Sequence, residues 1–238
     1  VLMHRREMVF YGGRFLRPVL LVDYDYHSGG QRFGLGSHRY QGAGDVTAIQ
    51  DGCFAVTDRR QEGNLIYLNP PGQPEAITQA VRAAAVPVAL TVTNKSNLAL
   101  RNLVFENYAC RYTDAAVQIG QRWKPDPQNR DNAFGVDNVI VDGCVFRWNN
   151  GAGLKLNWIR NLTVRDSRFH HNGNMGLSGG ALVDAVFEHN QTNFNAWRKL
   201  LAGYKEDWHS GGFKFGHLWR AKIKDHIQHS DEHKLFAP

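Results

Sequence analysis

The sequence has no long apolar run and no block of basic residues. No stretch of its 238 residues approaches the roughly 18 consecutive apolar residues that a membrane-spanning helix needs. The formal net charge is +6, yet lysines and arginines are scattered along the chain. Scattered positive charge fits an acidic polysaccharide or an ordinary basic surface better than a nucleic-acid-binding surface. We therefore expect neither a membrane nor a nucleic acid as partner.

Cysteine is scarce, and its spacing is not that of a metal site. Cys53, Cys110 and Cys144 are three in number, so at least one thiol cannot pair within the chain. Neither these cysteines nor the histidines His226 and His229 have the spacing of a zinc site. We expect buried cysteines that act as small apolar residues, and no metal site.

The second half of the chain contains a repeat of about 23 residues. Leu154-Lys155-Leu156 returns as Leu177-Ser178-Gly179, and further pairs have the same offset: Asn138 and Asn161, Val139 and Leu162, Val141 and Val164, Phe146 and Phe169. A fixed period of this size indicates stacked, similar structural units. Apolar and polar residues alternate within each unit, which is typical of half-buried strands.

Five segments follow this pattern, beginning at Ala89, Val117, Leu154, Leu177 and Phe213. Each predicts two short strands and two turns. Such units can coil, so that each coil lies roughly 4.8 Å from the next in parallel sheets. We expect three ladders of stacked side chains: Leu90, Val117, Leu154, Leu177 and Phe213; Phe105, Phe146 and Phe169; and Asn97, Asn138 and Asn161. The third ladder is expected at a turn, where Asn tolerates αL backbone.

The first part of the chain does not repeat clearly. We expect an N-terminal β extension at 1–87 and coils at 88–238. Residues 54–56 and 64–68 predict a β-hairpin, which Pro70-Pro71-Gly72 ends. Residues 74–85 fit a helix by propensity, and their pattern also fits strands.

Two insertions interrupt the period, at about 120–137 and 197–210. They contain charged residues and the tryptophans Trp123, Trp197 and Trp208. In repeat folds, insertions form loops on one face, often the binding face. We expect both to border a groove, with these tryptophans as platforms for sugar rings. Packing within the loops is the alternative.

The coil pattern, the hairpin at 53–72 and the segment 207–215, Asp-Trp-His-Ser-Gly-Gly-Phe-Lys-Phe, resemble the right-handed parallel β-helix proteins of the pectin-lyase-like superfamily. More narrowly, they are similar to bacterial β-helix proteins of glycosidase type. The resemblance covers about residues 50–230. It implies a right-handed parallel β-helix, an extracellular or periplasmic location and, by analogy alone, Ca²⁺ as a cofactor. The superfamily contains lyases, hydrolases, epimerases and non-catalytic spikes, so it does not define the activity.

The resemblance also raises the question of where the coils end. Related proteins continue through further coils, whereas this chain stops at Pro238, where the next coil is expected to start. Solenoids normally cap their ends, and an uncapped strand edge favours pairing with another chain. We expect a C-terminally truncated chain or an assembly partner, with self-association through the last coil.

Sites in this superfamily lie on the outer face of one sheet. The residues expected there are Thr91, Gln118, Lys155, Ser178 and Lys214. The two lysines would lie two coils apart, roughly 10 Å, which is about two sugar units. A lysine with a lowered pKa can take the proton next to a uronate carboxylate, while a second cation neutralises that carboxylate. Ordinary solvated lysines are the alternative.

The second insertion adds Asp207 and His209, which precede the strand of Lys214. His209 could act as an acid or base near neutral pH. A glycosidase needs two carboxyl groups roughly 5 to 10 Å apart. Asp114 and Asp207 are expected three coils apart, roughly 14 Å. The outer ladder itself contains no carboxylate.

These observations predict an all-β, carbohydrate-active protein, either a glycoside hydrolase or a polysaccharide lyase. The resemblance favours a hydrolase and the residues favour a lyase. The expected catalytic residues are Lys214, His209 and Asp207, and the expected substrate-binding residues are Lys155, Gln118, Ser178, Trp123 and Trp208. The alternative is a non-catalytic β-helix that binds carbohydrate or has a structural role, or an inactive fragment of a larger enzyme.

Overall fold

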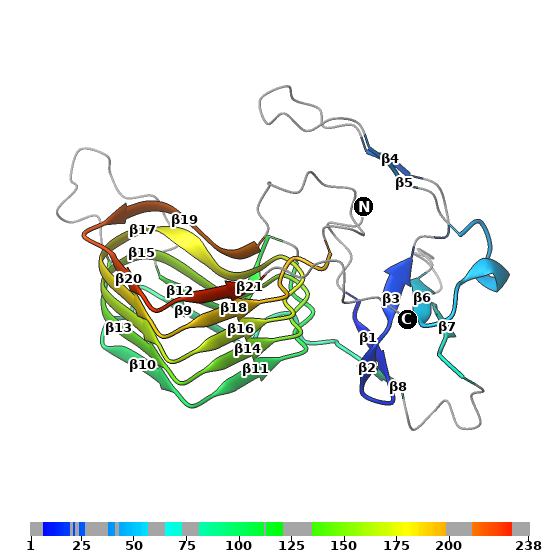
Figure 1. The fold of residues 1–238 in the computed structure, drawn as a ribbon, viewed down its shortest axis with the longest axis horizontal. Helices are drawn as coiled ribbons and strands as arrows, with labels where there is room; N and C mark the ends of the chain where they lie inside the picture. The colour runs from blue at the N-terminus through cyan, green and yellow to red at the C-terminus, as the bar shows by residue number, and fades with distance from the viewer. Residues whose placement is uncertain are drawn as a thin grey trace.

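The computed structural model describes residues 7–19, 21, 24–26, 38–40, 43–56, 65–72, 81–111, 113–120, 135–198 and 211–229. Figure 1 shows a stack of coils formed by the second half of the chain and, beside it, a group of short N-terminal strands. The described residues are almost entirely strand, turn and loop, and their 3-10 helix Val46–Ala48 is far too short to cross a membrane. The predicted all-β class is confirmed.

The N-terminal strands form three small sheets. One contains β1 (Val9–Tyr11), β2 (Arg14–Phe15) and β8 (Val81–Ala83), all antiparallel. Another contains β3 (Arg17–Val19), β6 (Cys53–Val56) and β7 (Ile66–Asn69), and the antiparallel pair β6–β7 is the predicted hairpin. The third pairs β4 (Tyr24–Tyr26) with β5 (His38–Tyr40). The sequence pattern of residues 74–85 fitted both a helix and strands. Residues 81–83 of this segment form a strand, and residues 73–80 lie outside the described residues.

The coils build two parallel sheets. The larger, called the large sheet below, contains β9 (Leu90–Thr93), β10 (Leu98–Arg101), β12 (Ala115–Gly120), β13 (Val136–Asp142), β15 (Ala152–Arg165), β17 (Met175–Glu188), β19 (Gly211–Trp219) and β20 (Lys222–Lys224). The other, called the small parallel sheet, contains β11 (Val104–Glu106), β14 (Val145–Arg147), β16 (Arg168–His170), β18 (Gln191–Asn193) and β21 (Ile227–His229).

Adjacent coils of the large sheet pair in the predicted register. Val117 lies opposite Leu90 on one side and Leu154 on the other, and Leu177 lies between Leu154 and Phe213. The three central residues of this ladder are fully buried. Side chains alternate between the two faces of a strand, so this register also fixes which residues point outward.

The phenylalanine ladder is confirmed on the small parallel sheet. The rings of Phe105 and Phe146 stack with centroids 5.0 Å apart, and those of Phe146 and Phe169 with centroids 4.8 Å apart. Each stacked pair contributes about 1 kcal/mol beyond the burial of its area. The ladder therefore holds successive coils in one register.

The asparagine ladder at the turn is also confirmed. Asn97, Asn138 and Asn161 have φ values of 59°, 60° and 56°. The Nδ2 of Asn138 donates to Oδ1 of Asn97 at 2.9 Å, and the Nδ2 of Asn161 donates to Oδ1 of Asn138 at 3.4 Å. Asn serves here because its side chain bonds along the stack while its backbone turns the chain.

One difference from the prediction concerns the corners between strands. Each coil was expected to have two short strands, but β15 and β17 are each 14 residues long and continue around a corner. Within β15, Trp158 and Asn161 both have a φ of 56°. Single αL residues bend the chain at these points while the backbone bonds to the neighbouring coil continue on both sides.

Buried polar ladders line the inside of the remaining turns. The amide of Asn172 donates to Oδ1 of Asn195 at 2.9 Å and to the backbone oxygen of Phe146 at 3.0 Å. Its Oδ1 accepts from Nδ2 of Asn149 at 3.0 Å. Asn149 and Asn172 are completely buried. Buried amides of this kind are stable only when their donors and acceptors are paired.

The three cysteines are free and buried, as predicted. Burial is the main cause that raises the pKa of Cys110 to about 11. At neutral pH this thiol is therefore protonated, which suits a structural residue rather than a nucleophile.

Candidate functional site

The outer face of the large sheet carries a continuous polar ladder. Register pairs join its members on successive coils: Thr91, Gln118, Lys155, Ser178 and Lys214. These are the outward positions that the sequence predicted. The ladder contains no carboxylate, so these residues cannot supply the paired acids of a glycosidase.

Two lysines define the upper part of this ladder. The side chain of Lys214 is exposed and makes no hydrogen bond or ion pair with any described residue. The Nζ of Lys155 donates to the backbone oxygen of Thr113 at 3.2 Å. Ser178 lies between the two lysines in the register and is only 7% exposed. The two lysines therefore lie on either side of a small residue that projects little from the sheet.

Gln118 extends the ladder below Lys155. Its side chain is half-buried, and its Nε2 contacts the backbone oxygen of Ala115 at 3.4 Å. That contact is at the long end of hydrogen-bond distances, so the amide remains available for a stronger partner.

A strip of glycines runs beside the lysines and was not singled out from the sequence. The next outward row of the large sheet consists of Gly120, Asn157, Gly180 and Gly216. At Gly180 a Cβ would lie 2.5 Å from the backbone oxygen of Gly216, whereas a Cβ at Gly216 would meet open space. At Gly180 and Gly216 the row therefore has no side chain beside Lys214.

The tryptophan predictions have mixed outcomes. Trp197 was expected to stack on sugar, and this is wrong: its side chain is fully buried and its Nε1 donates to the backbone oxygen of His171 at 2.9 Å. Arg198 is also buried, so the second insertion starts later than expected. Trp219 is instead 45% exposed, and its ring stacks on His217 with centroids 5.8 Å apart. Among the tryptophans that the structure describes, Trp219 is exposed enough to meet a ligand.

Several predicted residues lie outside the described residues. They are Trp123 of the first insertion and Asp207, Trp208 and His209 of the second. Their assigned roles therefore remain predictions. The described part of the site consists of the lysine ladder and the glycine strip.

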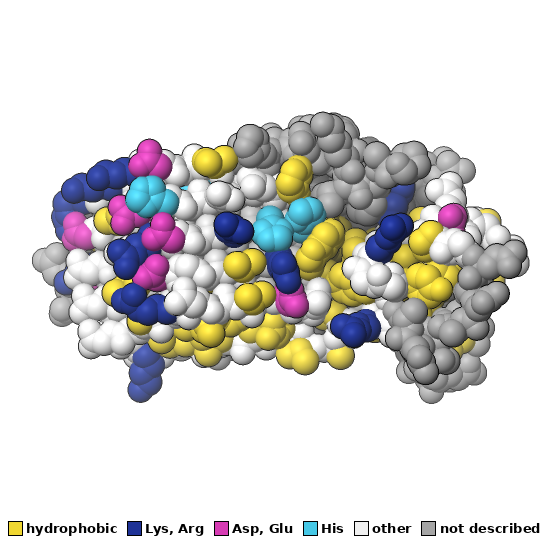
Figure 2. Space-filling model, turned by 60° about the horizontal axis from the view of Figure 1, so that its bottom comes forward, with side chains coloured by type: hydrophobic (Ala, Val, Ile, Leu, Met, Phe, Trp, Pro, Cys, Tyr) yellow, Lys and Arg dark blue, Asp and Glu magenta, His cyan; other side chains and the backbone are white. Residues whose placement is uncertain are grey.

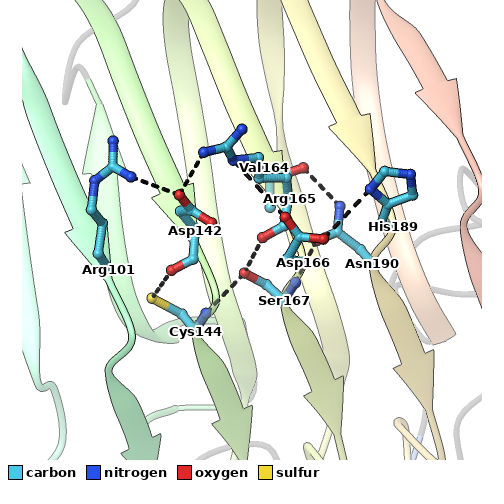
Figure 3. Close-up of polar contacts among 9 residues, drawn as sticks. All are labelled: Arg101, Asp142, Cys144, Val164, Arg165, Asp166, Ser167, His189 and Asn190. Atoms are coloured by element: carbon cyan, nitrogen blue, oxygen red, sulfur yellow. Dashed lines mark hydrogen bonds and ion pairs between the residues drawn. The ribbon is translucent and has the colours of Figure 1, made fainter.

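A charged row runs along the corner that follows the large sheet (Figure 3). Asp142 accepts from Nη1 of Arg101 at 2.7 Å and from Nη2 of Arg165 at 2.8 Å. The hydrogen bond from Arg165, reinforced by both positive charges, lowers the pKa of the Asp142 carboxyl. Positive and negative side chains of neighbouring coils neutralise one another along this row. We therefore assign the row a structural role.

The same corner contains His189 between two carboxylates of neighbouring coils. Its Nδ1 lies 3.5 Å from Oδ1 of Asp166, and its Nε2 lies 3.5 Å from Oδ2 of Asp225. No group of three or more His, Cys, Asp or Glu in the described residues could hold a metal ion. The described residues therefore offer no cluster of carboxylates for the Ca²⁺ that the resemblance implied, and that expectation stays a prediction.

His170 and His171 are both half-buried. The ring of His171 stacks on Trp148 with centroids 4.4 Å apart. Burial, followed by the charge of His170, lowers the pKa of His171 from 6.5 to about 4. His171 is therefore neutral at pH 7 and belongs to the packing around Trp148.

No protein-family model and no curated protein matches this sequence. Among solved structures, the A-modules of two mannuronan C-5 epimerases of Azotobacter vinelandii are similar. The AlgE6 module has 16% identity and a TM-score of 0.37, covering 59% of this chain and 43% of its own. The AlgE4 module has 15% identity and a TM-score of 0.39, covering 59% of this chain and 44% of its own. The chain thus spans less than half the length of either structure. Likeness at this level does not indicate an activity.

Proposed function

We propose that this chain is a right-handed parallel β-helix protein that acts on an acidic polysaccharide as a lyase, at the outer face of the large sheet. The observation that carries the proposal is the ladder itself, in which Lys155 and Lys214 flank the buried Ser178. The two lysines are about 10 Å apart along the stack, because parallel strands lie about 4.8 Å from one another. That separation matches about two sugar units of an extended polymer.

The chemistry would be a β-elimination on a uronate unit. Lys214, in its neutral form, would take the proton from C5, next to the carboxylate. The electron pair of the broken C5–H bond forms the C4=C5 double bond, and the C4–O bond breaks to release the next sugar, whose oxygen takes a proton from water. Lys155 would bind the carboxylate of another uronate unit, about two sugars along the polymer, since an ammonium has three donors and only one is used by Thr113.

The glycine strip supports the same proposal. A sugar ring that lies against Gly180 and Gly216 would approach the sheet without meeting a side chain of either residue. The polymer could then run along the stack past both lysines. By the resemblance, we further propose an extracellular or periplasmic location, where such polymers occur.

The proposal is tested by incubating the protein with a panel of uronate polymers. A lyase creates an unsaturated uronate, which absorbs in the ultraviolet. We expect this absorbance with at least one polymer. Reducing sugar released without that absorbance would instead make the protein a hydrolase. Retention of polymer in an affinity gel without any product would make it a binding module, and no absorbance with any polymer would overturn the lyase proposal.

A further inference from the structure

The outer face of the small parallel sheet carries a second polar surface, which the proposed function does not use. Its members lie on three successive coils: Arg147 on β14, Arg168 and His170 on β16, and Gln191 and Asn193 on β18. We call these residues the Arg168 patch. Figure 2 shows His side chains flanked by Lys or Arg side chains in the middle of the visible face.

Arg168 lacks the partner that other arginines of the coils have. Its side chain is exposed and makes no hydrogen bond or ion pair with a described residue. By contrast, Arg220 makes two hydrogen bonds to the carboxylate of Asp184, at 2.6 Å and 2.7 Å. An arginine whose donors are all available is suited to bind a carboxylate through two parallel hydrogen bonds.

His170 is held in a fixed orientation beside Arg168. Its Nδ1 lies 2.9 Å from Nδ1 of His171, so one of these two nitrogens donates to the other. This contact uses the Nδ1 side of the His170 ring, and its Nε2 has no hydrogen-bond partner among the described residues. Burial, then the charges of Arg147 and Arg168, lower the pKa of His170. The two guanidinium groups thus lie close enough to the imidazole to act on it.

The neighbouring coil adds neutral donors. Gln191 lies opposite Arg168, and Asn193 lies opposite His170. Strands of a sheet are about 4.8 Å apart, and outward residues on one strand are about 7 Å apart, so the four residues on β16 and β18 cover about the area of one sugar unit. Arg147 lies one coil further along the stack. Amides bind hydroxyl groups, whereas the arginine binds a carboxylate.

We propose that the Arg168 patch binds one uronate unit of an acidic polysaccharide. Arg168 would receive the carboxylate, and Gln191, Asn193 and His170 would receive the hydroxyl groups. Arg147 adds positive charge, although Glu106 accepts from its Nε at 2.6 Å. The patch lies on a different sheet from the lysine ladder, so this inference stands even if the lyase proposal fails.

The test measures binding of tetragalacturonate by the protein with both ladder lysines replaced, Lys155→Gln and Lys214→Gln. This background removes the charges of the large-sheet ladder. We expect binding that moves the NMR signals of the His170 ring. Adding Arg168→Gln should weaken that binding about tenfold or more, since a charge-assisted hydrogen bond is lost. Adding Lys222→Gln, which removes an exposed charge of the large sheet, should leave it unchanged.

Four results would overturn the inference. They are absence of binding, equal binding after Arg168→Gln, equal weakening by Lys222→Gln, and equally tight binding of a neutral galactose tetrasaccharide. A tetraglutamate peptide is the third ligand to compare. If it binds as tightly as tetragalacturonate, the patch recognises charge alone and the assignment to a sugar is wrong.

Discussion

At the scale of single residues, asparagine is the residue that stabilises the coils. Buried asparagines bond along the stack inside one turn, and exposed asparagines do so at another. Substitutions in the two sets should therefore lower the free energy of unfolding by different amounts. Replacing a buried amide leaves its partners unpaired away from water, whereas replacing an exposed one lets water take its place.

Asn172→Ala should lower the free energy of unfolding by about 3 kcal/mol or more, because it leaves several buried partners unsatisfied. Asn161→Gly is the matched control at an exposed turn. It keeps the αL backbone and removes one long hydrogen bond of 3.4 Å, so we expect a loss of about 1 kcal/mol or less. Urea unfolding measures both. Equal losses would contradict the assigned role of the buried ladder.

His171 should make stability depend on pH. Burial lowers its pKa to about 4 in the folded state, from an ordinary value of 6.5. Below 6.5 the unfolded chain binds a proton more readily than the folded one, so stability falls as the pH drops from about 6.5 to about 4 and then levels off. His170 and His226, whose pKa values are also lowered, contribute in the same direction.

The variant His171→Phe keeps a ring against Trp148 and cannot be protonated. We expect it to reduce the loss of stability between pH 6.5 and pH 4, measured by urea unfolding at a series of pH values. An unchanged pH profile would show that protonation of His171 does not cause the loss of stability at low pH.

At the scale of elements, glycine determines how closely successive coils can approach. Gly179 has a φ of +149°, and a Cβ there would lie 1.7 Å from the backbone oxygen of Leu156. Gly216 lies on the neighbouring coil and faces open space. The same substitution should therefore have opposite outcomes at the two positions.

Gly179→Ala should lower the free energy of unfolding by about 3 kcal/mol or more, because the coils must separate locally or the backbone must rearrange. Gly216→Ala should change it by less than about 1 kcal/mol. Thermal unfolding followed by circular dichroism distinguishes them. A well-tolerated Gly179→Ala would mean that the close approach of the coils is not required.

The elements also show what the sequence could and could not predict. Alternation within strands and the 23-residue offset predicted the inward Leu154 and the outward Lys155, because both follow from local geometry. The burial of Trp197 was missed, since the ring that covers it is Phe15, which is distant in sequence. The glycine strip was also missed, because Gly216 has no side chain to form a pattern.

At the scale of the whole molecule, the N-terminal strands pack against the coils through aromatic rings. Phe15 lies 4.6 Å from Trp197 and 5.7 Å from Trp148, measured between ring centroids. Phe10 contacts Trp148 edge-on at 6.5 Å. Met8, Phe10 and Trp197 form one buried cluster. The N-terminal segment therefore contributes to the stability of the coils.

Trp197→Ala should lower the free energy of unfolding by about 3 to 5 kcal/mol, the cost of removing a large buried side chain. It should also release the N-terminal segment, which limited proteolysis would detect as faster cleavage before residue 81. Trp219→Ala is the control, because that side chain is 45% exposed and its loss should leave cleavage unchanged. Equal cleavage of both variants would contradict the packing described.

The central claim is that the lysine ladder on the large sheet carries out the chemistry. The most direct measurement is the initial rate of ultraviolet absorbance on the best uronate polymer for Lys214→Ala, compared with Lys222→Ala, which removes an exposed lysine of the same sheet. We expect Lys214→Ala to be folded and inactive, whereas Lys222→Ala keeps the full rate. An unchanged rate in a folded Lys214→Ala protein would show that Lys214 is not the base.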